Sequence, residues 1–146
     1  MLLLAKERNI NVIQGVGEKL PFRSSVFGTI VFIVTLCFVD DVEAVLKEAH
    51  RVLIDGGDVI ACIVPKESSW GKYYARKARE NHPFYSHARF ITVRELENYL
   101  VKTDFKVIGK VGVLSFKPTE KPRWELPDTR TEGKGFVCIK ARKREG

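Results

Sequence analysis

Two nearly continuous apolar runs on either side of a helical pattern constrain this chain more than any other feature. The runs occupy residues 27–34 and 59–64 and do not alternate polar with apolar residues. Strands of that kind are covered on both faces, as in a parallel sheet. Between them, apolar residues recur at the spacing of one helix face, which predicts a helix over residues 42–53. Strand, helix and strand form a βαβ unit, whose crossover is expected to be right-handed.

The residues that flank the predicted helix are typical of helix ends. Asp40 can accept hydrogen bonds from the first turn, with Glu43 as its partner in a capping box. Gly56 and Gly57 follow the helix, and glycine there commonly adopts the left-handed conformation that ends a helix. The pattern therefore predicts both ends of the helix as well as its buried face.

Further elements are predicted before and after this unit. Upstream, the sequence predicts the end of a helix at residues 2–8, a short strand at 9–14 and a loop at 15–25. Downstream, Thr92 caps a helix with Glu95 as its box partner. Two strands, at residues 106–116 and 135–141, follow with a long loop at 117–134 between them. Because no helix joins these strands, we expect an antiparallel pair at the sheet edge.

Residues 66–90 differ in kind from the rest of the chain. Aromatic residues alternate there with lysine, arginine and histidine, and residues 69–80 predict a helix that Asn81-His82-Pro83 ends. A segment just after the carboxyl end of a strand is where open α/β sheets keep ligand-binding elements. The alternative is that these aromatic rings cap a small core, and the two interpretations are compatible.

The composition indicates a soluble globular chain. Its 146 residues are 45% hydrophobic and 29% charged, enough for one domain with a core. The longest apolar run is too short to span a bilayer, and the first residues lack the order of a signal peptide. We therefore expect a cytoplasmic protein that does not enter a membrane. A single glutamine among many Lys, Arg and Glu residues is typical of thermophilic proteins.

The net charge of +7 permits nucleic acid or acidic partners without establishing them. The basic residues gather in two clusters, one within residues 72–79 and one within 140–144. No known nucleic-acid-binding motif interleaves them. We interpret both clusters as solvated surface and do not expect nucleic acid as a partner.

The cysteines and histidines suggest no redox or metal chemistry. Cys37, Cys62 and Cys138 are an odd number, lie in apolar settings and form no CxxC pair, so reduced buried thiols are expected rather than a disulfide framework. His82 and His87 lack the spacing of a helical ligand pair and have no carboxylate beside them. The sequence therefore predicts no metal site.

Three short patterns, in this order, resemble one known family. They are Gly15-x-x-Glu-x-Leu-Pro-Phe22, Ser25-x-Phe27 before an apolar strand, and Glu48-Ala-x-Arg-Val-Leu-x-x-Gly-Gly57. Together they resemble the middle of a class I S-adenosylmethionine-dependent methyltransferase of the small-molecule type, over about residues 9–116. The resemblance implies a Rossmann-like α/β sheet with an antiparallel final strand, within one domain over residues 1–146. Residues 66–90 would then be an insertion on the substrate side.

The resemblance also implies a cofactor, S-adenosylmethionine, and candidate residues for it. Gly15, Val16 and Gly17 match the loop that binds the adenine, where the family often has an acidic or polar side chain at Val16. Ile33, Val34 and Thr35 match the strand end that lines the methionine part of the cofactor. The family commonly has Asp where this chain has Gly28. Tyr85 and His87 are candidates for contacting a small-molecule methyl acceptor, and no catalytic base is identified.

The family's first strand, its glycine-rich turn and its ribose-binding carboxylate should precede residue 9. The eight residues there cannot supply them, so the chain resembles an N-terminally truncated methyltransferase domain. Loss of the central strand should leave a bare strand edge and an uncovered apolar face.

Three functional hypotheses follow. The first is methyl transfer to a small molecule, impaired in this chain alone. The second is a non-enzymatic relative that binds or oligomerises, for example as a homodimer through the exposed strand edge. The third, and weakest, is a basic nucleic-acid-binding domain.

Overall fold

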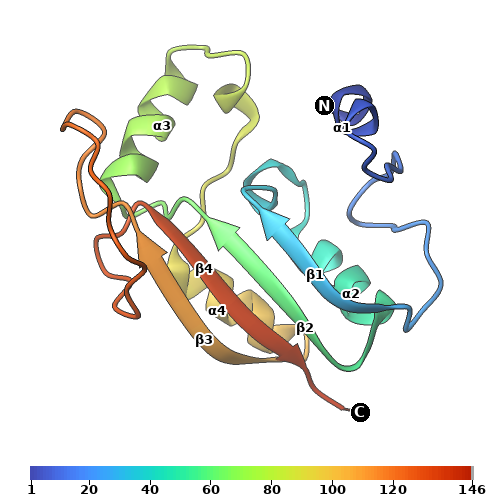
Figure 1. Ribbon diagram of the computed structural model, residues 1–146. Coiled ribbons are helices and arrows are strands. Elements are labelled where there is room, and N and C mark those ends of the chain that lie inside the picture. The colour runs from blue at the N-terminus through green and yellow to red at the C-terminus, as the bar shows by residue number, and fades with distance from the viewer. Residues whose placement is uncertain (146) are drawn as a thin grey trace.

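The structure, a computed structural model, describes residues 1–145 and is an α/β sheet with helices on one face (Figure 1). The elements are α1 (Leu2–Glu7), β1 (Phe27–Ile33), the short 3-10 helix η1 (Leu36–Phe38), α2 (Val42–Val52), β2 (Leu53–Ile63), α3 (Ser69–Arg79), the 3-10 helix η2 (Tyr85–His87), α4 (Val93–Lys102), β3 (Phe105–Val113) and β4 (Phe136–Lys143). The strand order is β1-β2-β4-β3. No helix within residues 1–145 has the length and apolar character needed to cross a bilayer.

The sheet confirms the predicted fold class and the direction of the last strand. β1 and β2 are parallel, as the βαβ pattern predicts, whereas β4 runs antiparallel to both of its neighbours, β2 and β3. β4 is therefore inserted between two strands that precede it in the chain, and β3 forms the edge. Because β1 forms the opposite edge, its outer backbone groups have no neighbouring strand within the described part of the chain.

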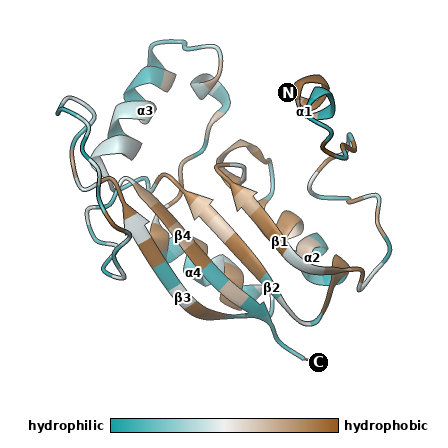
Figure 2. Ribbon diagram, in the orientation of Figure 1, coloured by the Kyte–Doolittle hydropathy of each residue, from teal (hydrophilic) through white to brown (hydrophobic). Residues whose placement is uncertain are grey.

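The core lies between the sheet and the helices α2 and α4, which cover the same face (Figure 1). The apolar stripe of α2 is buried as predicted: Val45, Leu46, Ala49 and Val52 are each no more than 1% exposed. Fully burying one such Val or Leu side chain contributes roughly 1.5–3 kcal/mol. In Figure 2, β1 and β2 are mainly coloured as hydrophobic, whereas α3, which lies outside this core, is mainly hydrophilic.

The helix ends follow the predictions only in part. The capping box of Thr92 and Glu95 is present at the start of α4. At α2, the prediction of Asp40 as the cap is wrong, because the Asp41 carboxylate accepts the N–H of Ala44 at 3.0 Å. With Asp41 as the cap, the third position of the helix is Ala44, so Glu43 is out of register for a capping box. The Glu43 carboxylate instead pairs with Lys102 of α4 and with Lys47, which holds the pKa of Glu43 down at about 2.

Two other local predictions are also wrong. Gly56 and Gly57 do not end α2, because β2 begins directly after Val52; Gly56, with φ +70°, instead lies in the irregular start of β2. Residues 9–14 are not a strand, and Ile10 and Ile13 are 56% and 58% exposed. An extended segment becomes a strand only where another backbone pairs with it, and in Figure 1 this segment runs apart from the sheet.

The sheet face opposite α2 and α4 carries an apolar row that crosses all four strands. In register, Ile33 lies beside Cys62, Cys62 beside Cys138, and Cys138 beside Val111. The outer members, Ile33 and Val111, are 65% and 41% exposed. The prediction of an uncovered apolar face therefore agrees with the structure, and no helix overlies this row in Figure 1.

The prediction that all three cysteines are reduced is wrong. Cys62 and Cys138 form a disulfide, whereas Cys37 is free and buried. The antiparallel insertion of β4 places the two residues directly opposite each other on β2 and β4, although they are 76 residues apart in the chain. The spacing of cysteines along a sequence indicates only pairs that are close in the chain. It could not indicate this pair, which is brought together by the pairing of β2 with β4.

We expect one free thiol per chain when the unfolded, unreduced protein is alkylated. Reduction should lower the free energy of unfolding by about 4 kcal/mol, because the disulfide closes a long loop of the unfolded chain. Urea unfolding with and without reductant measures this difference, and Cys37→Ser is the control that should leave it unchanged. Alkylation of three cysteines in the unreduced protein would show that the bond does not form.

Candidate functional site

The loop with the candidate residues Gly15, Val16 and Gly17 is tied to the start of α2. The Glu18 carboxylate accepts the backbone N–H groups of Asp40 and Asp41, at 3.2 and 3.4 Å. Both N–H groups belong to the connection between β1 and α2. The loop therefore lies beside the carboxyl end of β1, and the side chain of Val16 is 61% exposed there.

Gly17 packs closely against α2. A Cβ atom at this position would lie 3.1 Å from a methyl carbon of Val45, a residue of the buried helix stripe. A Cβ there would require Val45 or the loop to shift by a few tenths of an ångström. This glycine therefore brings the backbone of the loop onto α2, whatever else it contacts.

An ion pair on α2 holds the next part of the same loop. Glu48 and Arg51 contact each other at 2.7 Å, and the Glu48 carboxylate accepts the N–H of Leu20 at 2.7 Å. The Arg51 guanidinium donates to the carbonyls of Leu20 and Phe22, at 3.2 and 2.9 Å. The hydrogen bond from Arg51 lowers the pKa of Glu48 to about 2. The sequence pattern contained both residues, but only the structure shows that they fasten the loop.

The carboxyl end of β1 carries the second group of candidates, Ile33, Val34 and Thr35. Ile33 is mostly exposed, and the Thr35 hydroxyl donates to its carbonyl at 3.2 Å. Val34 has φ +49°, the left-handed region that a β-branched residue rarely adopts. Its N–H is held by the carbonyl of Cys62 at 2.9 Å. Backbone strain of this kind concentrates at ligand-binding positions.

The third group, Tyr85 and His87, reaches the same edge through the backbone. The N–H of Arg89 donates to the carbonyl of Cys37 at 2.7 Å, so the segment after η2 lies against the turn after β1. The ring of Tyr85 packs at a tilt against Tyr74 of α3, with ring centroids 4.8 Å apart, and His87 is exposed. The aromatic residues of this region thus pack on one another, as the small-core interpretation expects, while the segment also borders the candidate residues of β1.

Cys37 lies in this turn but is a poor nucleophile. Burial raises the pKa of its thiol to about 11, so it stays protonated at neutral pH.

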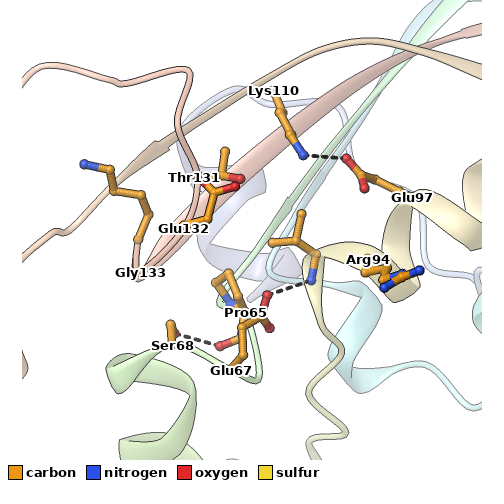
Figure 3. Close-up of a pocket in the computed structure, with 11 residues that line it drawn as sticks. Pro65, Glu67, Ser68, Arg94, Glu97, Lys110, Thr131, Glu132 and Gly133 are labelled. Carbon is orange, nitrogen blue, oxygen red and sulfur yellow. Dashed lines mark hydrogen bonds and ion pairs between the residues drawn. The ribbon is translucent and has the colours of Figure 1, made fainter.

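A separate pocket of about 390 Å³ lies between the loop before α3, α4, β3 and the loop before β4 (Figure 3). Glu97 and Lys110 form an ion pair across it at 2.8 Å, and the Glu67 carboxylate accepts the N–H of Val93 at 3.2 Å. None of the eight candidate residues lines it. Its walls come from four distant segments, so no local pattern in the sequence could have indicated it.

Comparison with known proteins agrees with the fold and with the order of the motifs. The family model described as "Methyltransferase domain" matches residues 1–61. A crystal structure from Thermotoga maritima, of an S-adenosylmethionine-dependent methyltransferase described as a possible histamine N-methyltransferase, superposes with a TM-score of 0.91. It is 35% identical in sequence, and the match covers 99% of this chain and 69% of that protein. The chain belongs to the class I S-adenosylmethionine-dependent methyltransferases.

Two proteins described as uncharacterized are also similar to this chain. A protein of Methanocaldococcus jannaschii is 35% identical over 144 residues, which cover 98% of this chain and 69% of that protein. A protein of Mycobacterium tuberculosis is 37% identical over 143 residues, or 96% of this chain and 50% of that protein. The chain thus spans about half the length of the mycobacterial relatives that it matches.

Membership in the methyltransferase family confirms the resemblance. It also means that the three segments with candidate residues belong to one methyltransferase sheet. The loop at residues 15–18, the end of β1 and the segment after η2 meet at one edge of a methyltransferase sheet. The assignment of individual residues to the cofactor or the acceptor stays a prediction. Sequence reasoning missed Glu18, Glu48 and Arg51, which hold this edge together, although their motif was the signal for the family.

We expect Glu48→Gln to loosen the loop and to change how stability depends on pH. The pKa of Glu48 is lower in the folded chain than its ordinary value of 4.5, so the unfolded state binds the extra proton. The parent chain should therefore lose stability as the pH falls from about 4.5 towards 2. The stability of the Glu48→Gln variant should not show this decrease between about pH 4.5 and 2, and at pH 7 the variant should be less stable than the parent chain.

Urea unfolding at a series of pH values measures both effects, with Glu7→Gln in α1 as the control. An unchanged pH profile in the Glu48 variant would contradict the role of this carboxylate.

Proposed function

We propose that this chain forms one side of a methyltransferase site, which transfers a methyl group from S-adenosylmethionine to a small molecule. The observation that carries the proposal is the convergence of three segments at the carboxyl end of β1. They are the loop at 15–18, the strand end at 33–35 and the segment at 85–89. Binding sites of open α/β sheets lie at this end of the strands.

The side chains at this edge suit the adenine and methionine ends of the cofactor. Val16, Ile33 and Phe38 are apolar and each at least 47% exposed, which is the character of an adenine slot. The strained backbone at Val34 and the backbone of Gly17 could approach the cofactor closely. When bound, the cofactor supplies the methyl group, and the residues of the chain would hold and orient it. Tyr85 and His87 would then face the methyl acceptor.

The glycine-rich turn and the ribose-binding carboxylate of the family would come from residues outside this chain. The length difference from the mycobacterial relatives supports this part of the proposal. It follows that the chain alone should bind the cofactor weakly and should have little activity. A small amine is the first acceptor class to test, because the Thermotoga relative is described as a possible histamine N-methyltransferase.

The exposed edge of β1 favours a second candidate function, self-association as a non-enzymatic module. β1 ends the sheet on one side, and Val31 is 50% exposed on it. An unpaired strand edge is a template for another strand. The occupant that we propose is a second copy of the chain, since two identical edges can pair symmetrically about a two-fold axis.

We expect S-adenosylhomocysteine to bind the isolated chain with a Kd near 1 mM, a free energy of roughly −4 kcal/mol. Amide shift changes in NMR spectra should fall at residues 16–17 and 33–35. Val16→Asp restores an acidic side chain at the adenine loop, so it should tighten binding about tenfold through one charged hydrogen bond. Val101→Asp, on the exposed side of α4, is the matched control.

Micromolar binding by the parent chain would mean that a dimer completes the site. If S-adenosylhomocysteine at several times 1 mM causes no shift change at residues 16–17 and 33–35, the enzymatic proposal is contradicted. That result would leave the non-enzymatic function as the better one.

We expect the chain to self-associate in a concentration-dependent way and Val31→Lys to weaken the dimer at least about tenfold. A lysine on an edge strand would place a charge in the paired interface. Sedimentation equilibrium measures the dissociation constant. Val101→Lys is the control, because Val101 is 51% exposed but lies on α4. A monomer at every concentration, with one cooperative melting transition, would contradict this proposal.

A further inference from the structure

A basic pocket of about 250 Å³ lies between the first turns of α3 and the loop after β3. Its charged lining residues are Lys72 and Arg76 of α3 and Lys117 of the loop. The remaining lining residues are Ser69, Tyr73, Pro118 and Thr119, so no carboxylate within residues 1–145 lines the pocket. Three like charges thus surround one small space.

These three cations have no counter-charge in the part of the chain that the structure describes. Neither lysine nor the arginine makes an ion pair there; Arg76 instead lies over the ring of Tyr73, at 5.6 Å from its centroid. The basic cluster of β4 differs, because Lys140 and Arg142 both pair with Asp58. The sequence suggested the same solvated surface for both clusters, but the structure separates them.

The pocket is held in shape by Trp70. The indole Nε1–H of Trp70 donates to the carbonyl of Phe116 at 2.7 Å, and the two rings meet edge to face at 6.0 Å. A Cβ at Gly135 would overlap the indole ring, so only glycine fits beside it. Because Phe116 is fixed to α3, Lys117 is fixed beside Lys72 and Arg76. The nearest acid in the loop, Glu120, accepts the backbone N–H of Lys117 and forms no ion pair with its ammonium.

We propose that this pocket binds the phosphate group of a small-molecule ligand. A guanidinium and two ammonium groups supply the donors that a phosphate dianion prefers, and the hydroxyl of Ser69 lies in the same lining. Bringing an anion among three cations removes their mutual repulsion. The volume accommodates a phosphate with a small organic group. A second basic pocket, of about 520 Å³ and lined by Lys106, Arg142 and Arg144 among others, differs because Glu145 lies in its lining and Arg142 pairs with Asp58.

The site is distinct from the proposed methyl-transfer site. Tyr73 forms a wall of the pocket and contacts Tyr74, with ring centroids 5.4 Å apart, and Tyr74 in turn contacts Tyr85 at 4.8 Å. A row of aromatic rings therefore separates the pocket from the candidate acceptor residues. Phosphate binding in this pocket does not depend on cofactor binding.

The test is titration of the chain with pyrophosphate at low ionic strength, by calorimetry and by NMR. We expect saturable binding, with shift changes concentrated at residues 69–76 and 117–119. The double variant Arg76→Gln/Lys117→Gln should weaken binding at least about tenfold. Trp70→Phe keeps the ring but removes the hydrogen bond to Phe116, so it should weaken binding to a smaller extent. Lys6→Gln in α1 is the control and should bind as the parent does.

Two results would overturn the proposal. One is a set of non-saturating shift changes spread over all basic residues, or concentrated at Lys106, Arg142 and Arg144 near the start of β3. The other is binding of a single-stranded oligonucleotide with a steep salt dependence that pyrophosphate does not compete with. The proposal is supported if pyrophosphate displaces the oligonucleotide from the parent chain and the double variant no longer shows this displacement. Circular dichroism melting of each variant shows whether a loss of binding comes from unfolding.

Discussion

The ion pair of Glu48 and Arg51 is the interaction on which the loop that leads from the candidate site to β1 depends. Both residues lie on the solvent side of α2, whose other side is buried against β2. From there they bind the backbone of residues 20–22, which has no secondary structure of its own. A segment without a strand ladder must satisfy its backbone groups in another way. The pair therefore connects a loop near the candidate site to a helix of the buried core.

The second constraint is the insertion of β4 between β2 and β3. It places residues far apart in the chain side by side, and the pair Cys62 and Cys138 is the clearest case. The same register aligns the apolar row from Ile33 to Val111 on the face without helices. The insertion of β4 thus produces the disulfide and joins the two halves of the apolar row. The pairing of the two cysteines cannot be derived from spacing along the sequence, because register is a property of two strands together.

The elements that the sequence predicted well are those whose stability is local. The stripe of α2 and the box at Thr92 each require only residues within a few turns. The predictions failed where a distant partner decides the outcome. The helix α2 begins one residue later than predicted, so Asp41 is the cap and Ala44 stands where a box needs an acid. Residues 9–14 have no strand to pair with. For the site, the motifs indicated the family and the loops involved. The contact between Arg89 and Cys37, which joins two of those loops, has no local signature.

The helix α3 lies outside the hydrophobic core that α2 and α4 form with the sheet. This helix is amphipathic, but the residues at its apolar side are aromatic and contact one another and Phe116 rather than the core of α2 and α4. Its cations lie outside the ion pairs that organise the sheet and α2. An element attached by a few aromatic contacts can change its surface at little cost to the fold. A methyltransferase sheet of this kind can therefore keep its core while α3 and the loop after β3 adapt to a particular ligand. The charges of Lys72, Arg76 and Lys117 lie together without an ion pair in residues 1–145, which adds nothing to stability and is the arrangement that the proposed phosphate ligand would use.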